Sequence, residues 1–144
     1  MLLSVNLSLP RDARFVSLMR DVASTLMSHL GTPDESAQDI LVAVSEACAN
    51  AVRHATGSHG YDVSVHVGED GCVIDVIDRG PGLPAEPPRS EADLDAEAGR
   101  GLLLMRALVD ELQFIREDDG HRLRLTKRWG PERLDLALAD PSAR

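Results

Sequence analysis

The pattern of apolar and polar positions along the chain predicts both strands and helices. Residues 3–9 alternate between apolar and polar side chains, which is typical of a strand that buries one face. Residues 61–67 and 72–78 are rich in β-branched residues, and the turn residues "EDG" at 69–71 favour a hairpin between them. The pattern predicts five strands in all, at residues 3–9, 61–67, 72–78, 113–118 and 121–129.

Two segments in the first half of the chain repeat apolar residues at helical spacing. The first covers residues 15–30, and Gly31 suits the end of a helix. The second begins with the residues "TPDE" and extends from residue 32 to about residue 55. The N-terminal cap that we expect there consists of Thr32 as the capping residue, Pro33 at the first helical position and Glu35, which completes a capping box.

A third helix and two irregular segments follow in the second half of the chain. The helix is expected to start near Gly99, and its apolar side is formed by Leu102, Met105, Val109 and Leu112. Residues 83–98 are rich in proline and carboxylates, which predicts a mobile loop. We expect residues 131–144 to form a loosely ordered tail, although "ERLDLALA" within it could form a short helix.

The order of these elements predicts the fold class. It reads strand, helix, helix, strand, strand, loop, helix, strand, strand, which lacks the strict alternation of a dinucleotide-binding fold. Because the strands cluster in hairpins and the helices can cover only one face, we predict an α+β fold. It would be a two-layer sandwich with a mixed, mainly antiparallel sheet. The 144 residues are enough for one domain, which we place at residues 1–130.

Composition argues against some classes of partner. The formal net charge of -9 repels phosphate backbones and only 3% of the residues are aromatic, so we expect no direct contact with nucleic acid. The charge suits a basic protein partner, although solubility alone also explains it. Cys48 and Cys72 lack the spacing of a metal site. No segment has the length of a membrane span, so we expect a cytoplasmic protein that does not contact a membrane.

The second predicted helix carries the first candidate functional residues, within "VSEACANAVRHA" at residues 44–55. Glu46 and Asn50 are four residues apart, so they project from the same face of the helix. That face lies away from the apolar stripe that packs on the sheet. Both residue types are also common on solvated helix faces, so the pair alone is ambiguous.

A second candidate motif is "DRGPG", residues 78–82, directly after a strand. Asp78 shares a strand face with Ile74 and Val76, so we expect it at the rim of the face that the helices cover, whereas Asp75 should face water. A carboxylate at such a rim needs a partner, and the exocyclic amine of a purine would serve. The same residues are also good turn formers without any ligand.

The third candidate motif is "GRGL", residues 99–102, at the start of the third predicted helix. Glycines at a helix N-terminus expose backbone amides, and the helix dipole adds to their attraction for phosphate. The alternative is that the glycines only form a flexible exit from the preceding loop.

The combination of these motifs is more specific than any one of them. E-x-x-x-N on a helix, D-x-G-x-G after a strand, an acidic loop and G-x-G at a helix start resemble the nucleotide-binding fold of the GHKL superfamily (the Bergerat fold). Within it, "VSEACANAVRHA" and "GRGLLLMRALVDEL" resemble the small anti-sigma factor serine kinases, the RsbW-like family. The resemblance extends from residue 1 to about residue 128, nearly the whole chain.

The resemblance implies a role for each matching residue. Asn50 corresponds to the asparagine that holds Mg2+ at the phosphates of ATP or ADP, and Glu46 to the glutamate that orients or deprotonates the attacking hydroxyl. Asp78 corresponds to the aspartate that reads the adenine amine, and Gly80 and Gly82 belong to the same turn.

The remaining matches concern the phosphates. Residues 83–98 would form the ATP lid, and the phosphates would lie against the backbone of Gly99, Arg100, Gly101 and Leu102. The Arg100 side chain could approach the terminal phosphate or point equally well into solvent. His54 also fits the end of the family's helix, although a favourable interaction with the helix dipole explains it equally well.

The resemblance also implies an activity and partners. It implies an ATP-dependent protein serine/threonine kinase and anti-sigma factor, which forms a homodimer, binds a sigma factor and phosphorylates a small anti-anti-sigma protein of the STAS type. The alternative is a non-catalytic ATP- or ADP-binding module that sequesters a protein partner. Glu46 favours the kinase, because binding alone requires no base. A catalytic domain of a histidine kinase and a gyrase-like ATPase are disfavoured, because both need further segments.

Overall fold

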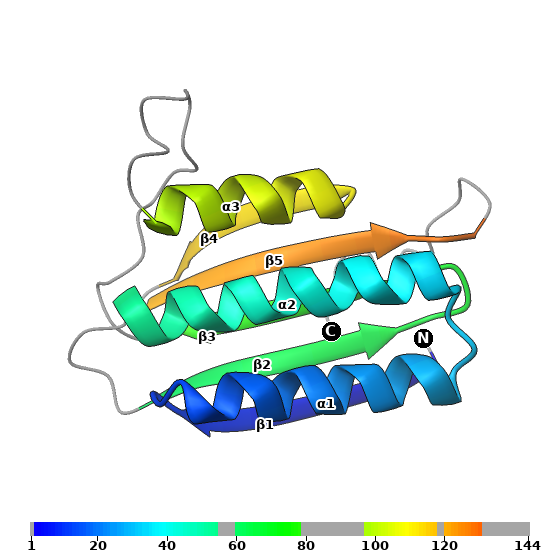
Figure 1. The fold of residues 1–144 in the computed structure, drawn as a ribbon, viewed down its shortest axis with the longest axis horizontal. Helices are drawn as coiled ribbons and strands as arrows, with labels where there is room; N and C mark the ends of the chain where they lie inside the picture. Colours follow the sequence, from blue (N-terminus) through cyan, green and yellow to red (C-terminus); the bar gives the residue numbers. More distant parts are fainter. Residues whose placement is uncertain (1, 55–59, 79–96, 118–119, 131–144) are drawn as a thin grey trace.

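The computed structural model describes residues 2–54, 60–78, 97–117 and 120–130 of the chain. These residues form an α+β fold with the expected order of elements (Figure 1). The elements are β1 (Leu3–Pro10), α1 (Arg14–His29), α2 (Asp34–His54), β2 (Gly60–Val67), β3 (Gly71–Asp78), α3 (Glu97–Leu108), β4 (Glu111–Glu117) and β5 (Gly120–Arg128).

The strands form one five-stranded sheet in the order β1-β2-β3-β5-β4, and every pairing between them is antiparallel. The three helices lie side by side on one face of this sheet, with α2 between α1 and α3 (Figure 1). The predicted two-layer sandwich is therefore confirmed, and the described sheet is antiparallel throughout.

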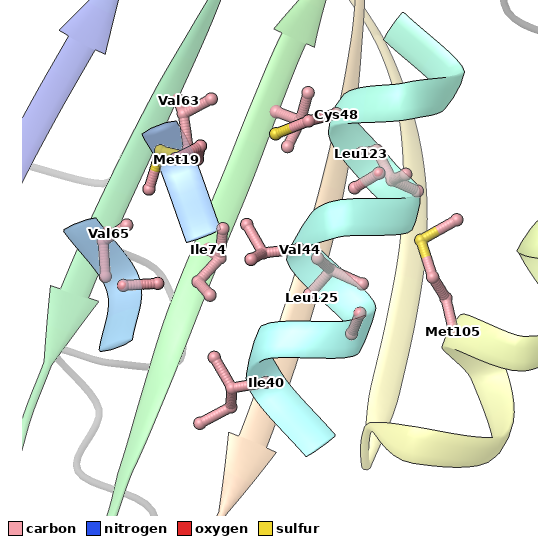
Figure 2. Packing of buried hydrophobic residues seen from close by; sticks show 14 of the residues in the cluster. Met19, Ile40, Val44, Cys48, Val63, Val65, Ile74, Met105, Leu123 and Leu125 are labelled. Carbon is pink, nitrogen blue, oxygen red and sulfur yellow. The ribbon is translucent and has the colours of Figure 1, made fainter. Parts of the chain in front are cut away.

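The core lies between α2 and the middle of the sheet. Figure 2 shows Ile40, Val44 and Cys48 of α2 directed towards the apolar side chains of the strands. These side chains meet because residues with helical spacing share one face of α2, and alternate residues of each strand share one face of the sheet. Met19 of α1 and Met105 of α3 complete the core on either side of α2.

Asp75 does not face water, contrary to the prediction. It does lie on the sheet face opposite the helices, but its side chain is only 1% exposed. Arg124 donates two hydrogen bonds to its carboxylate, at 2.8 and 3.1 Å, and Arg122 donates a third at 2.7 Å. Buried carboxylates of this kind need such partners. This ion pair could not be predicted from the sequence, because Arg124 is far from Asp75 in the chain and becomes its neighbour only when β3 pairs with β5.

Several element boundaries differ from the expected ones. In the expected cap the Thr32 oxygen would accept a hydrogen bond from a backbone amide of α2, whereas its hydroxyl donates to the sulfur of Met27 and α2 begins at Asp34. The third helix begins at Glu97, earlier than expected, and ends at Leu108, so Leu112 belongs to β4. As predicted, Gly31 lies just after the C-terminal end of α1, and its φ of 68° favours glycine.

Some predictions lie outside the described residues. They concern most of the predicted loop, residues 83–96, and the tail, residues 131–144. None of the helices in the described parts of the chain combines the length and apolar character that crossing a bilayer requires.

Candidate functional site

Three elements that carry predicted site residues meet at one end of the sandwich. The C-terminal end of α2, the end of β3 and the first turn of α3 lie together at the left of Figure 1. β2 and β3 are antiparallel, so Asp78, at the end of β3, lies opposite Tyr61, at the start of β2. Cys48 of α2 and Tyr61 belong to the same buried core, so the helix passes over this end of the sheet.

Asn50 does not lie on a solvated helix face. Its side chain is only 1% exposed, while Glu46, one turn earlier, is partly exposed. Arg53 donates a hydrogen bond of 2.6 Å from Nη2 to the Asn50 oxygen Oδ1. The other polar atom of this side chain, Nδ2, is buried and has no hydrogen-bond acceptor in the described part of the structure. A buried amide in this state is costly unless a ligand or water satisfies it.

Gly101 brings α3 into direct contact with the Glu46–Asn50 pair. A Cβ atom at this glycine would lie 2.8 Å from Oε2 of Glu46 and 3.8 Å from Oδ1 of Asn50. The first of these distances is too short for a carbon atom, so any larger residue here would have to displace the Glu46 carboxylate from its position. The structure thus brings Gly101 to Glu46 and Asn50, from which it is far apart in the sequence.

Asp78 is fully buried at the rim of the core, on the face that the helices cover. Its cross-strand neighbours are Tyr61 in β2 and His121 in β5. Burial raises the pKa of Tyr61 above its ordinary value, and proximity to Cys48 adds to the effect. The surroundings of Asp78 are therefore largely closed to solvent, as the strand pattern predicted.

A comparison with known protein families shows the family to which the chain belongs. The model of the family described as "Histidine kinase-like ATPase domain" matches residues 9–127 of the chain, which includes the end of β1, all three described helices, β2 to β4 and nearly all of β5. The chain belongs to this family. The matched segment contains all of the predicted site residues.

Curated relatives narrow the family further. The chain is 32% identical over 143 residues to the serine-protein kinase RsbW of Bacillus licheniformis, with 91% of this chain and 89% of that protein covered. It is 30% identical over 143 residues to the RsbW of Bacillus subtilis (strain 168), with the same coverage. It is therefore an RsbW-like member of the histidine kinase-like ATPase family.

A solved structure supports the fold. The crystal structure of the RsbU and RsbW domains of Rv1364c from Mycobacterium tuberculosis matches with a TM-score of 0.69 and 22% sequence identity. The match covers 92% of this chain and 34% of that chain, so this RsbW-like chain spans about a third of the length of that protein. This match supports the fold, while the identities to the two Bacillus proteins confirm the predicted relationship to the RsbW-like proteins.

For the other predicted residues of this RsbW-like site, the structure gives mainly their positions in the elements. Gly99, Arg100 and Leu102 lie in the first turns of α3; Arg100 is exposed, whereas Leu102 is buried in the core. His54 is the last residue of α2. Gly80 and Gly82 lie outside the described residues, so their predicted place beside the adenine remains a prediction.

Two arginines of the site were not predicted to act there. Arg53 was noted only as a residue flanking the Glu46–Asn50 face, yet it bonds directly to Asn50. Arg11, in the segment between β1 and α1, donates from Nε to the backbone oxygen of Val52 at 2.7 Å. This bond satisfies a carbonyl in the last turn of α2 and holds the helix end in place. The three-residue spacing of Asn50 and Arg53 could have revealed the first contact, whereas nothing along the chain indicates the second.

The donor atoms fit Mg2+ that arrives with a nucleotide. Among the described residues, no three His, Cys, Asp or Glu side chains gather closely enough to hold a metal. Mg2+ in phosphate sites needs no such cage, because it takes one or two protein ligands and completes its shell with phosphate and water oxygens. Asn50 Oδ1 already holds a cationic group, and Glu46 stands beside it. The one amide oxygen of Asn50 is a suitable protein ligand for such a shared metal.

Proposed function

We propose that the protein is an ATP-dependent protein serine/threonine kinase that acts as an anti-sigma factor. The observation that carries the proposal is the contact between Gly101 at the start of α3 and the Glu46–Asn50 pair of α2. This contact unites a carboxylate, an amide oxygen and a glycine-containing helix N-terminus, which are the groups that phosphoryl transfer needs for positioning and for charge neutralisation.

Each of these groups has a role in the proposal. Asp78 accepts a hydrogen bond from the adenine amine, a donor that suits a fully buried carboxylate. Asn50 holds Mg2+ against the phosphates, and the N-terminal end of α3 around Gly99 supports them with the helix dipole. Because α3 begins at Glu97, the amides of Gly101 and Leu102 lie far enough into the helix to bond within it. When bound, Mg2+ neutralises charge that develops on the transferred phosphoryl group.

Glu46 is the proposed base. Its carboxylate stands next to Gly101 and is partly exposed, so it remains accessible to a hydroxyl group of a partner protein. That hydroxyl must lose its proton during transfer, and a carboxylate within hydrogen-bond reach can accept it. A module that only bound nucleotide would not need a carboxylate at this position.

The proposed partners follow from the relationship to the RsbW-like proteins. The substrate would be a Ser or Thr of a small anti-anti-sigma protein of the STAS type, and the second partner would be a sigma factor. The net charge of -9 suits a basic surface on such a partner. A homodimer and a cytoplasmic location belong to the same proposal.

The test is phosphoryl transfer by the Glu46→Gln variant. Glutamine preserves size and hydrogen bonding but removes basicity, so transfer from radiolabelled ATP to a candidate anti-anti-sigma protein should fall by roughly 100- to 10,000-fold. ADP affinity, measured by calorimetry on the same variant, should stay close to that of the unmodified protein.

Asp78→Asn is the matched control for nucleotide binding. It places an amide donor opposite the adenine amine, so ADP affinity should fall while the fold is kept. A Glu46→Gln variant that phosphorylates its partner at the original rate would exclude the proposed base. If the unmodified protein binds ADP but phosphorylates no STAS-type partner, the non-catalytic binding module becomes the better interpretation.

A further inference from the structure

The atom that is proposed to hold the metal already has a cationic partner within the protein. Arg53 Nη2 lies 2.6 Å from Asn50 Oδ1, and the contact is partly buried. Both residues belong to α2 and are three positions apart, so the helix itself places the guanidinium over the amide oxygen. A hydrogen bond this short from a charged donor is among the stronger kinds that proteins form.

Arg53 and a metal ion cannot both use this oxygen in the same way. Mg2+ requires close to octahedral geometry with oxygen at about 2.0–2.1 Å, and a guanidinium bonded to the same atom would lie only a few ångströms from the ion. Two positive charges at that distance repel each other, and the repulsion is larger where the surroundings exclude water. Asn50 is 1% exposed, so screening by solvent at the shared atom is weak.

We propose that Arg53 is a built-in cation that occupies the place of Mg2+ at Asn50 and is displaced when the metal-loaded nucleotide binds. This inference rests on the proposed function, since it takes Asn50 as the metal-holding residue. Without metal, the guanidinium remains beside the phosphates and supplies part of the missing positive charge. With metal, it must give up its bond to Oδ1.

The proposal predicts how strongly Mg2+ and nucleotide binding are coupled. The coupling factor is the dissociation constant of ADP in excess EDTA divided by that in millimolar Mg2+. Arg53 tightens the binding of ADP without Mg2+ and weakens the binding of ADP with Mg2+, so it lowers the coupling factor. Removing its charge should therefore raise the factor through both effects.

The experiment is calorimetry with ADP under both conditions, for the unmodified protein and for Arg53→Met. Methionine retains the length and helix propensity of arginine but has neither charge nor donor. We expect the coupling factor to rise at least about fivefold, the lower end of typical coupling between two ligands. Arg53→Lys retains the charge and should stay within about twofold of the unmodified protein. Should the methionine variant not fold, Arg53→Gln removes the same charge with a polar side chain.

Arg20→Met is the matched control. Arg20 also binds α2, through a 2.9 Å hydrogen bond from Nε to the Ser45 hydroxyl, but it comes from α1. Its coupling factor should not change by more than about twofold. An equal rise in the Arg20 and Arg53 variants, or a lysine variant that behaves like the methionine variant, would overturn the proposal.

The Asn50→Ala variant separates this inference from the proposed function. If Mg2+ does not tighten ADP binding in the unmodified protein, or if Asn50→Ala leaves the coupling factor unchanged, Asn50 is not the metal-holding residue and both proposals fail. If Asn50→Ala lowers the factor while Arg53→Met leaves it unchanged, the metal site stands and the role of Arg53 alone is excluded.

Discussion

At the scale of single residues, Gly101 determines how the two halves of the site meet. It lies within α3, where glycine costs up to about 1 kcal/mol relative to alanine. The helix tolerates that cost because a Cβ atom there would approach Oε2 of Glu46 to 2.8 Å. The glycine therefore leaves room for the Glu46 carboxylate and does not stabilise the helix.

We expect Gly101→Ala to separate stability from activity. The new methyl group should push the Glu46 carboxylate aside, because the end of a flexible side chain moves more readily than a helix. Thermal unfolding should show unchanged or slightly higher stability, whereas phosphoryl transfer should fall at least about tenfold, by loss of positioning.

A double-mutant cycle with Glu46→Gln shows whether the effect passes through this carboxylate. In the Glu46→Gln background, Gly101→Ala should lower transfer by less than about twofold. Independent, additive losses would instead show that the alanine acts on the phosphates or on the helix.

At the scale of elements, α2 and α3 are joined at both ends, by different means. At the site end the contact is made by Gly101. At the opposite end Lys127 of β5 donates from Nζ to Asp39 of α2 at 3.0 Å and to the backbone oxygen of Leu108 at 2.8 Å. Leu108 is the last residue of α3, so its carbonyl has no partner within the helix. Lys127 thus ties both helices to the sheet, away from the nucleotide site.

We expect Lys127→Met to lower stability without affecting nucleotide binding. It leaves a helix-terminal carbonyl and a partly buried carboxylate without their donor, which should cost about 1–2 kcal/mol in urea unfolding. ADP affinity should stay within about twofold, because the site lies at the other end of α3. Asp39→Asn removes the charge of the ion pair only and should cost less. A large loss of ADP affinity in Lys127→Met would show that the two ends of α3 are coupled.

At the scale of the whole molecule, the core contains two thiols that burial keeps neutral. Cys48 and Cys72 are both free and buried. Burial raises the pKa of each thiol from 9.0 to about 12. A raised pKa means that the folded protein holds these protons at a pH where the unfolded chain has released them. Stability should therefore fall as the pH rises from about 9 towards 12.

The fall should be visible between pH 8 and pH 10. At pH 10 the unfolded chain gains about 1.4 kcal/mol for each thiol that ionises with the ordinary pKa of 9.0. Urea unfolding at both pH values measures the loss. In a Cys48→Ala, Cys72→Ala variant, the loss should be smaller by about 2–3 kcal/mol, whatever the cost of the new cavities. An equal loss in both proteins would show that other groups cause it.

The sequence alone determined the elements, the fold class and the family. Helical and strand periodicities are local, so the five strands and three helices of the described residues could be predicted from the chain, with errors confined to their ends, as at Thr32 and Leu112. The site motifs were also readable, because E-x-x-x-N and G-x-G are short patterns within single elements.

Only the tertiary structure decided which of these residues touch. The antiparallel pairing of β3 with β5 places Arg124 beside Asp75 and buries a carboxylate that the strand pattern assigned to solvent. Likewise, the packing of α3 on α2 places Gly101 on Glu46. Contacts between distant segments depend on register and helix packing, which periodicity does not encode, because it records only which face of an element is apolar.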